Sequence, residues 1–253
     1  MKKVGIIGYG WLGSRISRNF AENFEMHATT TSPQKLKNIR SEGIQADLAV
    51  FNEDEKHYPD PWNIAPELDV IIITVPFSER RTSKEILQKK LSNLISFIGK
   101  FEKQLFFMST TSVYPDESGI FKEEMLPSEN VFTENKIKEA FPQINILRLG
   151  GLMGDSRLLK NFNVSDLSGV VNHIHYEDVS AVILKMIEKD VRGKVYNVVA
   201  SLHPLKQEVI AAQNNQYIDD MQYNKERIIS SEKLITELDF TFIHPDPKNF
   251  HLD

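Results

Sequence analysis

A glycine-rich segment near the amino end constrains the fold of this chain more than any other feature. Gly8, Gly10 and Gly13 form a Gly-x-Gly-x-x-Gly pattern, which lies between a short apolar run at residues 4–7 and a segment with apolar residues every four positions. Between a strand and a helix, this pattern is typical of a dinucleotide-binding turn. Gly8 allows the tight turn, Gly10 leaves room for a pyrophosphate, and Gly13 lets the helix pack closely on the strand. The alternative is a turn without a ligand, which the flanking strand and helix make less favourable.

Strand-like and helix-like segments alternate through the first 150 residues. Apolar runs predict strands, and apolar residues at helical spacing predict helices. The predicted strands are 4–7, 26–30, 44–50, 69–75, 105–109 and 144–148, and the predicted helices are 12–24, 33–41, 86–98 and 129–141. This alternation predicts an α/β fold with a Rossmann-type doubly wound parallel sheet. The carboxyl ends of its strands then meet along one edge, where ligands bind.

The pattern changes after residue 150. A polar loop is expected up to residue 170, followed by an amphipathic helix at 179–187, a strand at 195–199 and short helices at 206–213 and 231–238. We therefore predict an NAD(P)-binding Rossmann domain over residues 1–150, with strand 195–199 rejoining its sheet. Residues 151–253 are expected to form a small α+β substrate lobe that is not an independent domain.

Composition excludes several classes of protein. The absence of cysteine rules out a disulfide scaffold, a zinc ribbon, an iron–sulfur site and a cysteine nucleophile. With 30 Lys and Arg against 35 Asp and Glu, the net charge of −5 favours neither nucleic acid nor an anionic membrane. The apolar runs at 4–7 and 70–75 are too short for a signal peptide or a membrane span. We expect a soluble, cytoplasmic protein with a small-molecule substrate, and leave open a homodimer.

The segment after the second predicted strand distinguishes the two nicotinamide cofactors. Sites for NAD usually have an acidic residue about 20 residues beyond the first glycine, where it binds the ribose hydroxyls. Residues 28–35 contain no carboxylate but include Thr30, Thr31, Ser32 and Lys35. Hydroxyls and a cation can bind a 2′-phosphate, which an acid would repel. We therefore expect NADP, with NAD as the alternative, although Ser32 is also suited to cap a helix.

Four further segments resemble extended short-chain dehydrogenases/reductases of the NAD(P)-dependent epimerase/dehydratase type. They are the Ser/Thr-rich strand end with Val-Tyr at 107–114, the Arg-x-Gly turn at 148–154, the His-containing segment at 172–178 and the Tyr-Asn-Val strand at 195–198. Together with the glycine turn, these segments follow the order of the family. The chain is most similar to small, atypical members that have a shortened substrate lobe.

The glycine pattern, the end of the second strand and the resemblance together define a set of expected cofactor contacts. Val75-Pro76 at the end of the fourth strand fits the atypical subgroup. The expected cofactor-binding residues are Gly8, Tyr9, Gly10, Trp11, Leu12, Gly13, Thr30, Thr31, Ser32, Lys35, Val75, Pro76 and Lys136.

The resemblance also implies a set of catalytic residues, with one departure. The family uses a tyrosine acid/base, a lysine one helical turn later, and a Ser/Thr at the end of the fifth strand. Thr110 corresponds to the Ser/Thr and Lys136 to the lysine, but Phe132 stands where the tyrosine is expected. A phenyl ring cannot transfer a proton, so Tyr114 becomes the candidate substitute acid. The alternatives are a structural Tyr114, a solvated Lys136 and a Thr110 hydroxyl bonded to backbone.

Other polar residues carry weaker functional hypotheses. Glu124 and Glu134 could serve as acids only if they were buried, and their sequence context suggests surface charges. His173 and His175 would share one side of a strand, but no third ligand lies at a suggestive spacing, so no metal site is expected. The arginines at 80–81 are interpreted as a solvated helix start, with an anionic substrate as the alternative.

These observations favour an NADP-binding, epimerase/dehydratase-like protein. We expect an oxidoreductase that acts on a small carbonyl or sugar-like substrate. Phe132 supports a rival hypothesis, a non-enzymatic NADP(H)-binding sensor or regulatory protein. A β-hydroxyacid dehydrogenase shares the glycine turn and Val75-Pro76, but it would need a long, all-helical C-terminal domain.

Overall fold

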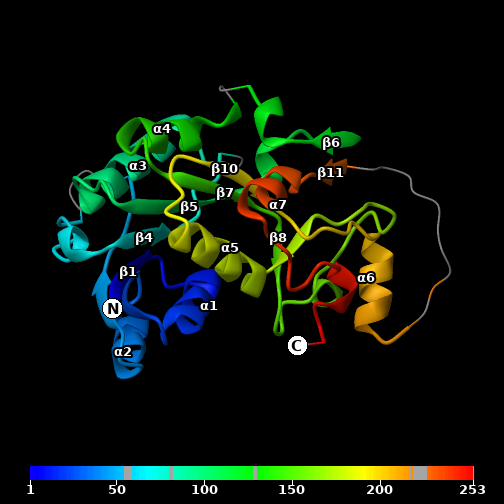
Figure 1. Ribbon diagram of the computed structural model, residues 1–253, viewed down its shortest axis with the longest axis horizontal. Coiled ribbons are helices and arrows are strands. Elements are labelled where there is room, and N and C mark those ends of the chain that lie inside the picture. The colour runs from blue at the N-terminus through cyan, green and yellow to red at the C-terminus, as the bar shows by residue number, and fades with distance from the viewer. Residues whose placement is uncertain (54–58, 80–81, 128–129, 217, 219–226, 253) are drawn as a thin grey trace. The chain divides into compact units, whose positions relative to one another are not determined.

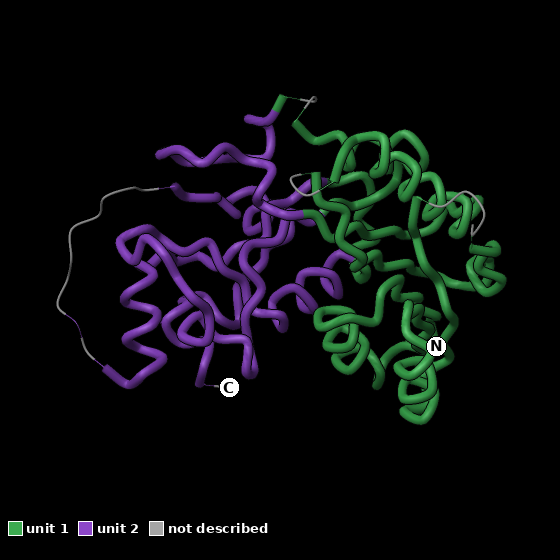
Figure 2. Tube along the Cα trace, turned by 180° about the vertical axis from the view of Figure 1, so that it is seen from behind, with its two compact units in different colours: residues 1–109, 127–146, 187–194 green, residues 110–126, 147–186, 195–253 purple. Residues whose placement is uncertain are grey.

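The computed structural model describes residues 1–53, 59–79, 82–127, 130–216, 218 and 227–252, so the arginines at 80–81 lie outside the described residues. The chain groups into two compact units that alternate along the sequence (Figure 2). The first unit comprises residues 1–109, 127–146 and 187–194, and the second comprises 110–126, 147–186 and 195–253. This grouping differs from the single boundary expected at residue 150, because the chain passes repeatedly from one unit to the other.

Strands and helices alternate through the first part of the chain, as the apolar pattern predicts (Figure 1). The elements are β1 (Lys2–Ile7), α1 (Trp11–Phe20), β2 (Phe24–Thr30), α2 (Pro33–Ser41), β3 (Gln45–Leu48), β4 (Val70–Ile73), α3 (Lys84–Ile98), β5 (Gln104–Thr110), α4 (Phe132–Ala140) and β7 (Asn145–Leu149). Short 3₁₀ turns lie between them or follow later in the chain: η1 (Ala65–Glu67), η2 (Thr111–Val113), η3 (Glu123–Met125), η5 (Leu159–Asn161) and η6 (Pro247–Asn249).

The central sheet has seven strands in the order β10-β7-β5-β4-β1-β2-β3, with β10 (Val195–Val198) at one edge. Strand β1 pairs in parallel with both β2 and β4, and Val4 lies opposite Met26 on one side and Val70 on the other. Strands β3 and β5 extend the sheet outward, again in parallel. The strand order therefore reverses beside β1, which is the topology of a doubly wound α/β fold. The predicted fold class is confirmed.

The central strands of the sheet are buried on both faces, and β4 is the clearest case. All four of its residues, Val70–Ile73, are buried, and β1 is buried from Val4 to Ile7. Strands covered on both faces need apolar side chains at every position instead of an alternating pattern. The continuous apolar run at 70–73 is therefore the sequence signal of a central strand.

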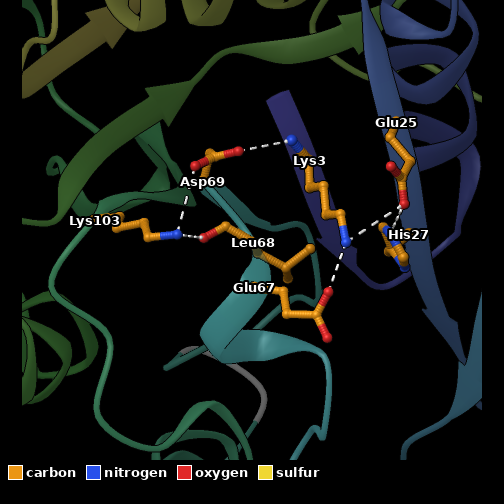
Figure 3. A network of polar contacts seen from close by, with 7 residues as sticks. All are labelled: Lys3, Glu25, His27, Glu67, Leu68, Asp69 and Lys103. Carbon is orange, nitrogen blue, oxygen red and sulfur yellow. Dashed lines mark hydrogen bonds and ion pairs between the residues drawn. The ribbon is translucent and has the colours of Figure 1, made fainter. Parts of the chain in front are cut away.

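A polar network fastens the amino ends of these strands (Figure 3). The Lys3 amide donates to Asp69 Oδ2 over 2.9 Å, and Lys3 Nζ lies 2.6 Å from Glu67 Oε2. Lys103 Nζ donates to the Leu68 carbonyl over 2.6 Å. The hydrogen bond from Lys3 is the largest cause of the lowered pKa of the Asp69 carboxyl. These bonds fix the start of β1 beside β4 and β5, at the end of the sheet opposite the glycine turn.

The second unit contains short strands, of which only the one with His173 and His175 was expected from the sequence. Strand β6 (Gly119–Phe121) pairs with β11 (Arg227–Ile229), and β8 (Gly151–Met153) pairs with β9 (His173–His175). The polar loop expected up to residue 170 therefore includes a strand, β8, and a 3₁₀ turn, η5. A strand of three residues has too few positions for a periodic pattern, which is why β6, β8 and β11 gave no signal.

The helices of the second unit follow the predicted segments. They are α5 (Tyr176–Glu188), α6 (Lys206–Gln213) and α7 (Glu232–Leu238). A buried apolar cluster packs beside α6 and includes Met153, Leu159, Val209 and Phe250. Within the described residues, no helix combines the length and the apolar composition needed to cross a membrane.

Candidate functional site

The glycine turn between β1 and α1 has the conformation that the sequence predicts. Gly8 has φ +103°, a conformation that L side chains rarely adopt, and an added Cβ would lie 2.8 Å from Val75 Cγ2. At Gly13 an added Cβ would lie 2.4 Å from the Gly8 carbonyl oxygen. Gly8 is therefore required for the turn, and Gly13 for the close approach of α1 to β1.

The amino end of α1 is open. Its N-cap is Gly10, which supplies no capping side chain, and an added Cβ there would meet only the Gly8 carbonyl oxygen, 4.0 Å away. The first amides of a helix have no intrahelical acceptor, and the helix dipole places partial positive charge at this end. The amides at a helix start beside an open glycine are suited to bind a phosphate.

Two threonines hold the turn against neighbouring strands. The Gly8 amide donates a hydrogen bond to Thr29 Oγ1 in β2 over 3.1 Å, and the Tyr9 amide donates one to the Thr29 carbonyl over 2.7 Å. Thr74, directly after β4, donates its hydroxyl to the Gly8 carbonyl over 2.6 Å. Sequence reasoning missed both residues. They could have been found from their position, since each carries a hydroxyl at the carboxyl end of a strand adjacent to β1.

The end of β2 combines buried and exposed hydroxyls. Thr30 is buried and accepts the Ser32 amide, while Ser32 accepts the Lys35 amide and caps α2. Thr31 and Lys35 are exposed. Arg40 donates from Nε and Nη2 to the Ala46 carbonyl, over 3.0 and 2.7 Å. The described segment therefore offers an exposed hydroxyl and an exposed cation, with no acidic side chain among residues 28–35.

The remaining predicted cofactor residues differ in exposure. Tyr9 is buried, and its hydroxyl donates to Glu42 Oε2 over 3.1 Å, so its side chain belongs to the core between β2 and α2. Leu12 is also buried, whereas Trp11 is half-buried with the Arg15 guanidinium 4.0 Å from its ring centroid. Val75 is half-buried against Gly8 and Pro76 is exposed.

Helix α4 begins at Phe132 and carries Lys136 one turn later. The Thr133 amide donates to Glu79 Oε1 over 2.8 Å, so a carboxylate from the segment after β4 caps this helix. Lys84 Nζ lies 5.8 Å from the Phe132 ring centroid, and Lys136 Nζ lies 2.6 Å from Glu139 Oε2. The four-residue spacing places Phe132 and Lys136 on the same face of α4, as the resemblance implies.

Glu134 is not a surface charge, contrary to the expectation from its sequence context. Its side chain is buried, and Oε1 accepts a hydrogen bond from Ser109 Oγ over 2.7 Å. Ser109 lies next to the end of β5, so this bond fastens α4 to the carboxyl end of a central strand. Sequence patterning missed it, because the burial of one polar residue depends on which face of a short helix packs inward.

Thr110 and Tyr114 belong to the second unit. Thr110 is exposed, and its Oγ1 accepts the Ser112 amide over 3.2 Å, which makes it the N-cap of η2. Tyr114 is fully buried; its hydroxyl donates to Asn197 Oδ1 over 2.8 Å and accepts from Arg148 Nη1 over 2.9 Å. Burial is the main cause of the raised pKa of Tyr114. These contacts favour a structural role for Tyr114.

We expect Tyr114→Phe to lower the free energy of unfolding by about 1–3 kcal/mol, because the buried Asn197 and Arg148 groups lose this partner. Denaturant unfolding measures the change. Tyr176→Phe is the control, since it removes a hydroxyl that donates to Asp155 Oδ1 at the exposed surface over 3.2 Å, and it should cost much less. A Tyr114→Phe variant as stable as the native chain would contradict the structural role.

No family model matches the sequence. The chain is 26% identical over 269 residues to "Protein YeeZ" of Escherichia coli strain K12, which covers 98% of each protein. The name of that relative describes no activity.

Solved structures match nearly the whole chain. A dTDP-glucose 4,6-dehydratase from Bacillus anthracis, solved in complex with NAD, has a TM-score of 0.71 at 15% identity and covers 100% of this chain and 96% of its own. A UDP-N-acetylglucosamine 4-epimerase from Bacillus cereus has a TM-score of 0.70 at 15% identity, covering 99% of this chain and 96% of its own. The chain therefore has the fold of the NAD-dependent epimerases and dehydratases of the extended short-chain dehydrogenase/reductase type.

Proposed function

We propose that this chain binds NADP(H) at the glycine turn and is an oxidoreductase of the epimerase/dehydratase type. The observation that carries the proposal is the geometry of the turn. Gly8 and Gly13 stand where any side chain would be strained or would clash, while Gly10 stands beside open space at the uncapped start of α1. A turn that binds no ligand needs glycine at positions 8 and 13, but it does not need the open space beside Gly10. The residues present therefore fit the pyrophosphate of a dinucleotide.

The choice of NADP rests on the charge of the segment after β2. A carboxylate at this place binds the ribose hydroxyls of NAD and repels a 2′-phosphate. Thr31 and Lys35 are exposed there, and residues 28–35 include no acid. The matched dehydratase was solved with NAD, which supports a nicotinamide cofactor in general. The preference for the phosphorylated form is drawn from this chain's own residues.

The proposed substrate is a small carbonyl or sugar-like molecule, and the proposed location is the cytoplasm. When bound, the cofactor supplies or accepts a hydride. Among the chain's own residues, Lys136 is proposed to hold the nicotinamide ribose and the exposed Thr110 hydroxyl to bind the reacting oxygen. Phe132 leaves the usual proton donor absent from α4, so turnover by this route is slow unless the substrate or water supplies the proton.

A second candidate function follows from the same observation at Phe132. A chain that keeps the dinucleotide turn but has a phenyl ring in place of the acid suits a sensor that binds NADP(H) without chemistry. The two candidates share the cofactor site and differ only in turnover. Oxidation of NADPH in the presence of aldehydes, ketones and sugar nucleotides therefore separates them.

We expect Gly10→Leu to abolish dinucleotide binding without unfolding the protein. The new side chain enters the open space beside the α1 amides, where it meets little protein but blocks a phosphate. Calorimetric titration with NADP measures the binding, and thermal unfolding checks the fold. Gly10→Ala should show an intermediate loss. Full retention of affinity in the leucine variant would refute the placement of the pyrophosphate.

We expect Lys35→Glu to weaken NADP at least tenfold more than NAD, because the new carboxylate repels the 2′-phosphate at short range. Lys37→Glu is the matched control, since it makes the same charge change at another exposed position of α2. Equal losses for the two cofactors would remove the argument for NADP.

We expect Phe132→Tyr to raise any reductase activity at least tenfold, because a positioned general acid contributes about 10²–10⁴-fold. Initial rates of NADPH oxidation measure the effect. Phe162→Tyr adds the same hydroxyl at an exposed site and should leave the rate unchanged. An unchanged rate in both variants would argue against the match of Phe132 to the family's tyrosine.

A further inference from the structure

Three metal-ligating side chains meet in the second unit, and none of them belongs to the proposed cofactor site. His175 ends β9, Glu177 lies in the first turn of α5, and His244 comes from the segment after α7. One donor atom from each residue lies within 4.8 Å of the other two. Sequence spacing could not show this cluster, since His244 is 67 residues away from Glu177.

The convergence is fixed by backbone contacts. Asp178 accepts the Ile243 amide at Oδ1 over 2.6 Å and the His244 amide at Oδ2 over 3.1 Å. The C-terminal segment is thereby held at the amino end of α5. His244 is thus delivered to the cluster by hydrogen bonds that do not involve its ring.

The geometry identifies the atoms that face one another. His244 Nε2 lies 2.8 Å from Glu177 Oε2, and His175 Nδ1 lies 3.8 Å from the same oxygen. The opposite nitrogen of His175 faces Gly154, where an added Cβ would be 2.4 Å from Nε2. Gly154 therefore allows the ring to turn Nδ1 towards the carboxylate.

The surroundings also suit a metal. The Tyr176 hydroxyl lies 3.5 Å from Glu177 Oε1, and the other carboxylate oxygen, Oε2, faces both histidines. The ring centroids of Phe250 and His175 are 5.4 Å apart. Outer contacts of this kind orient metal ligands. His175 is fully buried, so the cluster is shielded from solvent on the side of β9.

We propose that His175, Glu177 and His244 form a binding site for a divalent transition metal of the Zn²⁺ class. Two imidazoles and one carboxylate are a known zinc donor set, with a fourth position for water. Bonds of about 2.0–2.2 Å in tetrahedral geometry place donors roughly 3.4 Å apart. The 2.8 Å distance between His244 Nε2 and Glu177 Oε2 would therefore lengthen, and separations of up to 4.8 Å would shorten by about 1.4 Å at most. Nitrogen donors favour Zn²⁺ over Mg²⁺ or Ca²⁺. The bound ion would tie the C-terminal segment to α5.

The alternative is a plain hydrogen bond between His244 and Glu177. Glu177→Gln separates the two, because glutamine keeps an oxygen for hydrogen bonding but loses the charge that a zinc ligand needs. His244→Gln removes a second ligand. His251→Gln is the matched control, since it removes a half-buried histidine seven residues further along the same segment.

The experiment uses the untagged full chain, stripped with a chelator and titrated with Zn²⁺ by calorimetry. We expect one Zn²⁺ per chain for the native protein and for His251→Gln, and affinity at least tenfold lower for Glu177→Gln and His244→Gln. Zinc should also raise the thermal midpoint of the first two only, by mass action. No binding by the native chain, or equal binding by all four proteins, would overturn the proposal. NADP titration of the same samples is a separate readout.

Discussion

The close contact between Gly13 and the Gly8 carbonyl is the constraint on which the first unit depends. The absence of a Cβ at Gly13 allows α1 to lie directly against the end of β1. Thr74 and Thr29 then bind the same turn from the strands on either side of β1. The turn and the open start of α1 are therefore one structural feature. A bulkier residue at position 13 would disturb both.

The fold was largely predictable because its central strands are buried on both faces. Continuous apolar runs such as 70–73 and the helical spacing in α3 identify elements without knowledge of their neighbours. The boundaries were less accurate: β3 covers Gln45–Leu48 instead of 44–50, because the apolar residues Ile44, Ala49 and Val50 extend the apolar run beyond the paired strand. The three-residue strands β6, β8 and β11 gave no signal, because their existence depends on a partner distant in sequence. The grouping into two units depends on packing for the same reason.

The role of a site residue could be predicted where backbone geometry determines it. It could not be predicted where the role depends on whether the side chain is buried. The roles of Gly8 and Gly13 follow from the motif alone. Tyr114 was a candidate acid and Glu134 was expected to be a surface charge, yet both side chains lie in the interior, held by Arg148 and Ser109. His244 lies beside Glu177 only because Asp178 anchors the segment that carries it.

The glycine at the start of α1 also has a thermodynamic consequence. A serine or aspartate there would cap the helix, and glycine in its place costs only a few tenths of a kcal/mol. The amides left without a cap retain their capacity for an external acceptor. An anion that takes this place would complete the hydrogen bonding of the first helix. Binding of the anion would then also raise the free energy of unfolding.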